Sequence, residues 1–153
     1  MLNQLTDLSY KLGGQLILLE EQEFSNLRKN NMLSVAPFVS YSLGIDYDNK
    51  NIFYSQGSDY GHVIHEMAHV FASKTPPFSS DEISFIGWEF AVAKHINLDI
   101  EKWCSQLSDY MIDDNTAFIN LPTKEKELFL KERYDFCISE GMVSKDGIPL
   151  SIR

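Results

Sequence analysis

The segment His62-Val-Ile-His-Glu-Met-Ala-His69 contains three of the four histidines of the chain. Within it, His65, Glu66 and His69 form a His-Glu-x-x-His (HExxH) pattern. On a helix, positions i and i+4 lie one turn apart on the same face, and two imidazoles at that spacing can bind one zinc ion. Glu66 then lies beside the metal and can take a proton from a water molecule whose pKa zinc lowers towards about 7. The pattern predicts a zinc site with Glu66 as the catalytic base.

A catalytic zinc needs a third protein ligand and one open position. Glu89 follows His69 by 20 residues and belongs to a stripe of helical spacing, formed by Ile86, Glu89, Phe90 and Ala93. A carboxylate within an apolar stripe is costly to bury unless it is paired, and zinc would pair it. The alternative partner is a core Lys or Arg, but the chain has only 13 of these residues. We therefore expect Glu89 to be the third metal ligand.

Other side chains are weaker candidates. His62 lies three residues before His65 and could donate a hydrogen bond to a metal ligand; the alternatives are an oxyanion stabiliser and a solvated residue near the helix start. Glu82 lies seven residues before Glu89, near the same face, and could contact a metal ligand; the alternative is an acid of the first helical turn that stabilises the helix dipole. His95 could bind a metal, but it is offset from the face of Glu89. Three tyrosines could each donate a hydroxyl to a transition-state oxyanion, and the sequence does not choose among Tyr60, Tyr110 and Tyr134.

The length and composition predict one folded domain over residues 1–153. The chain has 153 residues, of which 44% are hydrophobic and 12% aromatic, as in globular proteins. Its formal net charge of −9 disfavours binding to nucleic acid or to anionic membranes. The charge is compatible with a soluble protein or with one that docks on a basic partner.

The two cysteines, Cys104 and Cys137, are far apart in sequence and form neither a disulfide framework nor a metal knuckle. The N-terminal residues lack the basic and apolar regions of a signal peptide. No apolar run approaches the roughly 18 residues of a membrane span. These features favour a cytoplasmic protein with reduced thiols, in the host cytoplasm if a phage encodes it.

The expected elements begin with strands and helices mixed and continue mostly with helices, which is typical of an α+β fold. Turn residues at 48–51 predict a hairpin over 41–55. Ser58 or Asp59 can cap the HExxH helix, and Pro76 and Pro77 end it. A turn at 145–147 precedes a tail that either forms a terminal strand or frays. We further expect a strand over 15–20 and helices over 3–12, 21–30, 79–96, 98–112 and 123–141.

The stretch IDYDNKNIFYSQGSDYGHVIHEMAHVFA resembles the hairpin and active-site helix of ImmA/IrrE-like peptidases and other minimal gluzincins. The gap between His69 and Glu89 is similar to that of thermolysin-like enzymes. GWEFAVAKHI and EGMVSKDGIP also resemble segments of uncharacterised phage and bacterial HExxH proteins. The chain lacks the third histidine of the metzincins and the paired acids of many ImmA-type third-ligand segments. The resemblance covers residues 43–96 most specifically.

The resemblance implies a minimal zincin-like fold, in which a small mixed sheet or hairpin packs on the active-site helix. It also implies a zinc metallopeptidase in which His65, His69 and Glu89 bind the metal and Glu66 is the base. An extended protein or peptide substrate would bind along a sheet edge. The alternative is a non-catalytic zincin-fold protein that occludes a partner, such as a phage-encoded inhibitor of a host factor.

Overall fold

The computed structural model describes residues 1–29, 34–37, 42–73, 82–105, 107, 112–113 and 115–152, without the side chains of residues 28, 34–37 and 82–84. Within these ranges the chain is a mixed α and β structure, and the α+β prediction is confirmed at this level.

The strands form a four-stranded sheet in the order β1-β4-β3-β2. Its strands are β1 (Gln15–Leu18), β2 (Ser34–Pro37), β3 (Ser42–Asp46) and β4 (Asn51–Tyr54). Strands β3 and β4 form the predicted antiparallel hairpin, and Lys50 has a positive φ of 54° in its turn. Strand β2 pairs antiparallel with β3, whereas β1 pairs parallel with β4. Neither β2 nor the parallel pairing was predicted, because β2 is a four-residue segment and β1 meets β4 across a long stretch of sequence.

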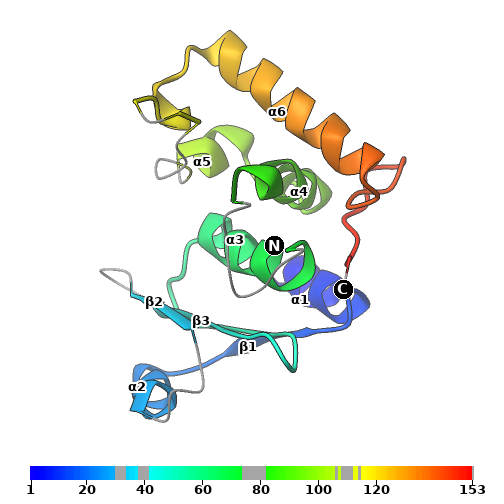
Figure 1. Cartoon of the computed structure of the whole chain (residues 1–153). Coiled ribbons are helices and arrows are strands. Elements are labelled where there is room, and N and C mark those ends of the chain that lie inside the picture. The colour runs from blue at the N-terminus through cyan, green and yellow to red at the C-terminus, as the bar shows by residue number, and fades with distance from the viewer. Residues whose placement is uncertain are drawn as a thin grey trace.

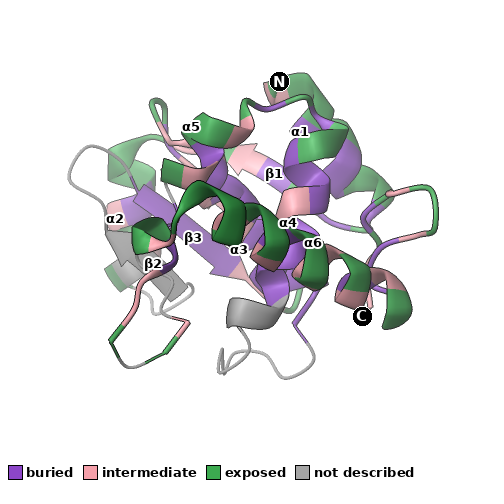
Figure 2. Cartoon of the chain, turned by 90° about the horizontal axis from the view of Figure 1, so that it is seen from above, coloured by how far each residue is buried: buried purple, intermediate pink, exposed green. Residues whose placement is uncertain are grey.

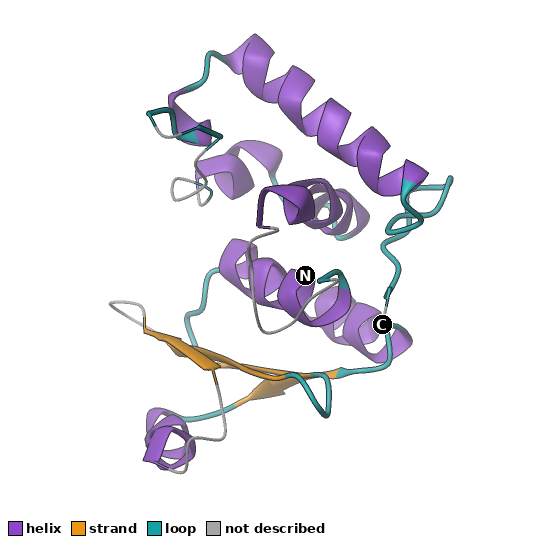
Figure 3. Cartoon of the chain, viewed as in Figure 1, coloured by secondary structure: helices purple, strands orange, loops and turns teal. Residues whose placement is uncertain are grey.

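The helices lie in layers on the sheet (Figures 1 and 3). Helices α1 (Leu2–Lys11) and α3 (Tyr60–Phe71) cover one face, and α2 (Glu21–Lys29) lies on the other. Helices α4 (Glu82–His95) and α5 (Ile100–Ser105) lie beyond α3, and α6 (Thr123–Ser139) forms the outermost layer. None of the helices described is long and apolar enough to cross a membrane.

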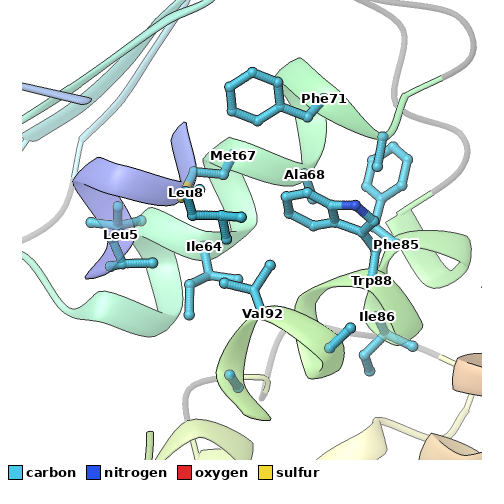
Figure 4. Close-up of a cluster of buried hydrophobic side chains, with 14 of the residues drawn as sticks. Leu5, Leu8, Ile64, Met67, Ala68, Phe71, Phe85, Ile86, Trp88 and Val92 are labelled. Atoms are coloured by element: carbon cyan, nitrogen blue, oxygen red, sulfur yellow. The ribbon is translucent and has the colours of Figure 1, made fainter. Parts of the chain in front are cut away.

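Helix α3, which carries the HExxH pattern, is covered on both sides. It begins after Asp59, whose extended backbone (φ −66°, ψ 129°) precedes the first helical turn. Apolar side chains of α1, α3 and α4 form a core around it (Figure 4), and most residues of α3 are buried. Strand β3 of the sheet is almost wholly buried as well (Figure 2). Among the core side chains are Leu5, Leu8, Ile64, Met67, Phe71, Phe85, Trp88 and Val92. This packing buries two polar side chains of α3, Glu66 and His69, beside the apolar core.

Helix α6 packs closely on α4 at Gly87. A Cβ atom at this position would collide with the carbonyl oxygen of Arg133, so the absence of a side chain lets the two helices meet. The buried Cys137 side chain lies at the same contact. Helix α5 spans six residues, fewer than expected, because Leu107 is already outside the helix.

The C-terminal segment is bonded to the helical layers and does not fray. Gly141 has a φ of 73° where the chain leaves α6, and Val143 then forms an isolated bridge with Pro149. The indole Nε1 of Trp88 donates to the carbonyl oxygen of Leu150 (2.9 Å). The amide of Ile152 donates to the carbonyl oxygen of Phe71 (2.9 Å). The tail therefore bridges α4 and the end of α3.

Candidate metal centre

Helix α3 brings His65 and His69 together, as their spacing predicts. Their Nε2 atoms lie 3.1 Å apart. The ring centroids are separated by 4.7 Å, and the ring planes are nearly perpendicular at 86°. The two imidazoles therefore turn the same kind of nitrogen towards one point.

Helix α4 places Glu89 against the same pair. Its Oε1 atom lies 3.0 Å from Nδ1 of His65, and its side chain is fully buried. This nitrogen is on the opposite edge of the His65 ring from the one that faces His69. Glu89 therefore lies beside the histidines, as expected, but it contacts Nδ1 of His65 and not the Nε2 atom that faces His69.

The spacing of the two imidazoles fits a zinc ion. Two ligand nitrogens at 2.0–2.1 Å from a tetrahedral zinc lie about 3.3 Å from each other. The distance of 3.1 Å between the Nε2 atoms is close to that value. Across the part of the chain that the structure describes, no group of three or more His, Cys, Asp or Glu side chains is placed to hold a metal ion. This agrees with the contacts of His65, whose Nε2 faces His69 and whose Nδ1 faces Glu89. Direct binding of a metal by Glu89 stays a prediction.

Glu66 is buried within α3, with 9% of its surface exposed. It follows His65 directly and lies three residues before His69, so it is a neighbour of His69 on the helix. The next two residues, Met67 and Ala68, belong to the apolar core. A carboxylate in such surroundings is sheltered from bulk water, and a charge of this kind is stabilised by a nearby cation or by hydrogen bonds.

Phe85 is a neighbour of the site that the sequence reasoning missed. Its ring meets His69 edge to face, with centroids 5.3 Å apart and planes at 78°, and it is buried. Phe85 precedes Glu89 by four residues, so both side chains lie on the same side of α4. That spacing was a signal that this aromatic ring would approach the histidines.

The remaining candidates lie elsewhere or outside the described side chains. His62 is partly exposed, and its Nδ1 lies 3.9 Å from a carboxylate oxygen of Asp59 at the start of α3. Glu82 is the first residue of α4, but its side chain is outside the described part. His95 is exposed at the end of α4. That His62 and Glu82 support the metal ligands stays a prediction.

The three candidate tyrosines differ in where they lie. Tyr60 lines a cavity of about 720 Å³ at the N-terminal end of α3. Tyr134 packs edge to face on Phe90, and the Lys94 ammonium group lies 4.8 Å from the centre of its ring. Tyr110 lies outside the described residues. Tyr134, a residue of α6, therefore packs against side chains of α4.

No protein family, curated protein or solved structure matches the chain.

Proposed function

We propose that the protein is a zinc-dependent metallopeptidase of zincin-like type that hydrolyses a peptide bond in a specific protein substrate. The observation that supports the proposal is the pair of Nε2 atoms of His65 and His69 at 3.1 Å. Two imidazoles that face each other at this distance suit a shared cation, and Glu66 lies between them in sequence.

In this proposal, His65 and His69 would hold the metal through Nε2, and Glu89, which lies beside His65, would be the third ligand. Bound zinc would supply a Lewis acid that polarises the scissile carbonyl group and acidifies water. Glu66 accepts the proton of the attacking water and then delivers it to the leaving amine. Its burial keeps the proton transfer away from bulk solvent.

The sheet offers a place for an extended substrate. The order β1-β4-β3-β2 leaves β1 and β2 at the edges, and a peptide can add to such an edge by main-chain hydrogen bonds. The net charge of −9 agrees with a protein substrate and not with nucleic acid or an anionic membrane surface. We also place the protein in the cytoplasm, because Cys104 and Cys137 are both free thiols.

The proposal is tested with two variants of the site. We expect Glu66→Gln to bind zinc as the wild type does and to lose peptide hydrolysis, because an amide cannot accept the proton. We expect His69→Ala to lose stoichiometric zinc, because one of the two facing nitrogens is removed. Zinc is measured by elemental analysis, and hydrolysis by mass spectrometry of candidate proteins with and without a chelator.

The exposed Glu132→Gln serves as the matched control, because it makes the same chemical change on the surface of α6. Hydrolysis that persists in Glu66→Gln, or that a chelator leaves unchanged, would contradict the proposal. Bound zinc without hydrolysis of any candidate would leave a zinc-binding protein that acts by occupying its partner.

A further inference from the structure

We propose that the open edge of β1 and the cavity at the N-terminal end of α3 bind an extended segment of a basic partner protein. One Arg or Lys side chain of that segment lies in the cavity. This docking surface goes beyond the proposed function, because it needs no metal. Neither histidine of the facing pair is among the described residues that line the cavity. Tyr60, which does line it, lies five residues before His65, about 7–8 Å along the helix at 1.5 Å per residue.

The first step concerns the main chain of β1. The strand lies at the end of the sheet order β1-β4-β3-β2, so it has a neighbour on one side only among the strands described. The amide of Leu19 donates to the carbonyl oxygen of Tyr54 on β4 (2.8 Å). Main-chain groups alternate in direction along a strand, so Leu16 and Leu18 turn their N–H and C=O groups towards the open edge. Such an edge is a template for the main chain of an extended segment.

The second step concerns the wall of the cavity, which begins at β1 with the exposed side chain of Leu18. Its apolar side chains come from Met1, Leu2, Leu18 and Leu98, and its aromatic ones from Tyr54 and Tyr60. Burial raises the pKa of the Tyr54 hydroxyl and the charge of Tyr60 adds to this effect, so the two phenols are neighbours. A long basic side chain suits this wall, because its stem is aliphatic and its cationic head is attracted to aromatic faces.

The third step concerns charge. Of the lining side chains that are charged at neutral pH, Asp59 and Asp99 are acidic and Lys102 is basic. Oδ1 of Asp99 accepts hydrogen bonds from the amides of Glu101 (3.0 Å) and Lys102 (3.4 Å), which holds this carboxylate beside the cavity. The formal net charge of −9 attracts a basic partner and repels a second copy of the chain. The charges therefore favour a basic segment as the occupant.

The first experiment measures which side chain the cavity prefers. The probes are fluorescein-labelled hexapeptides of Thr and Val in which one central position is Arg, Lys, Leu or Glu. Their binding to the full chain is followed by fluorescence polarisation in the presence of a chelator. We expect the Arg and Lys peptides to bind about tenfold more tightly than the Glu peptide, with the Leu peptide between them. Equal affinities for the Arg and Glu peptides, tightest binding of the Leu peptide, or no binding of any peptide would overturn the proposal.

Leu18→Pro and Leu18→Ala separate the main chain of β1 from its side chain. Proline removes an N–H group that β4 does not use and is tolerated on an edge strand, whereas alanine keeps this group. We expect the Arg peptide to bind Leu18→Pro about five- to tenfold more weakly than Leu18→Ala, as for one lost hydrogen bond. Circular dichroism shows that both variants are folded. Equal affinities would overturn pairing with β1, as would a wild-type dimer that Leu18→Pro converts to a monomer in sedimentation.

Asp99→Asn and Lys102→Gln test the charges of the cavity. Both residues are exposed, and Asn can still cap α5. We expect Asp99→Asn to weaken binding of the Arg peptide about two- to fivefold and Lys102→Gln to strengthen it by a similar factor. Asp146→Asn is the matched control, because it makes the same change at an exposed residue of the C-terminal segment. A loss in Lys102→Gln, or an equal loss in Asp99→Asn and Asp146→Asn, would overturn the placement of a basic side chain in the cavity.

The two proposals fail in different ways. Selective binding of the Arg peptide by a protein that holds no zinc and cleaves no candidate would support the docking surface and contradict the proposed function. Zinc-dependent cleavage by a protein that does not discriminate between the Arg and Glu peptides would support the proposed function and overturn the docking surface.

Discussion

Burial of Cys137 makes its ionisation unfavourable to the native state. The thiol lies between α4 and α6, and burial is the main cause that raises its pKa from an ordinary 9.0 to about 11. The native protein therefore keeps this proton at pH values where the unfolded chain has released it. The stability that the protonated thiol contributes is complete below about pH 9 and is lost as the pH rises towards about 11.

We expect the melting temperature of the wild type to fall over this interval more steeply than that of Cys137→Ala. The variant lacks the thiol but keeps Cys104, Tyr54 and Lys131, whose pKa values are also raised. Thermal unfolding at several pH values, followed by circular dichroism, measures the difference. Parallel curves for the two proteins would show that this thiol does not ionise in the way that its burial implies.

At the scale of residues, the sequence predicted the part of the site that depends on one helix. His65 and His69 are four residues apart, so helical geometry alone brings their rings together. The sequence also indicated that Glu89 would lie near them. It did not indicate that Glu89 would approach Nδ1, because that contact depends on the rotation of the His65 ring and on the packing of α4 against α3. The contact of Phe85 with His69 depends on the same packing.

At the scale of elements, the contact of α4 with α6 depends on a glycine. Position 87 leaves no room for a Cβ atom beside the Arg133 carbonyl group, which belongs to the backbone and cannot rotate away. We expect Gly87→Ala to lower the free energy of unfolding by about 1–3 kcal/mol, because an overpacked interface must shift. Chemical denaturation measures the change.

His95→Ala is the control for this substitution, since it changes an exposed residue near the end of the same helix. We expect it to have little effect on stability. If Gly87→Ala were as stable as that control, the close approach of α4 and α6 at position 87 would not be required.

Elements with strong local signals were predicted from the sequence. The hairpin of β3 and β4 and the helices α1, α2 and α6 follow from turn residues, apolar spacing and glycines near their ends. Helix α5 is shorter than predicted and strand β2 was not predicted, because short segments carry little periodicity. The parallel pair of β1 and β4 depends on contacts between distant segments, which no local pattern specifies.

At the scale of the whole molecule, the C-terminal segment ties layers together. Its backbone bonds to Trp88 of α4, to Phe71 of α3 and to Met142 after α6. We expect removal of residues 150–153, which make these three hydrogen bonds, to lower the free energy of unfolding by about 3 kcal/mol, at roughly 1 kcal/mol for each bond lost. Denaturant unfolding measures the loss, and the fluorescence of Trp88 should shift to longer wavelength as water reaches the indole. Removal of residue 153 alone is the control, and an equal effect of both truncations would contradict a bracing role for the tail.

The parallel pairing of β1 with β4 affects how the chain folds during translation. The first strand emerges from the ribosome early, but its partner over residues 51–54 is made only after the two strands between them. The helix that bears His65 follows directly, so the sheet and the helix that rests on it become available at nearly the same time. We therefore expect the nascent chain to stay without its central sheet until that helix has been synthesised, and folding to be slower than in proteins built from local contacts.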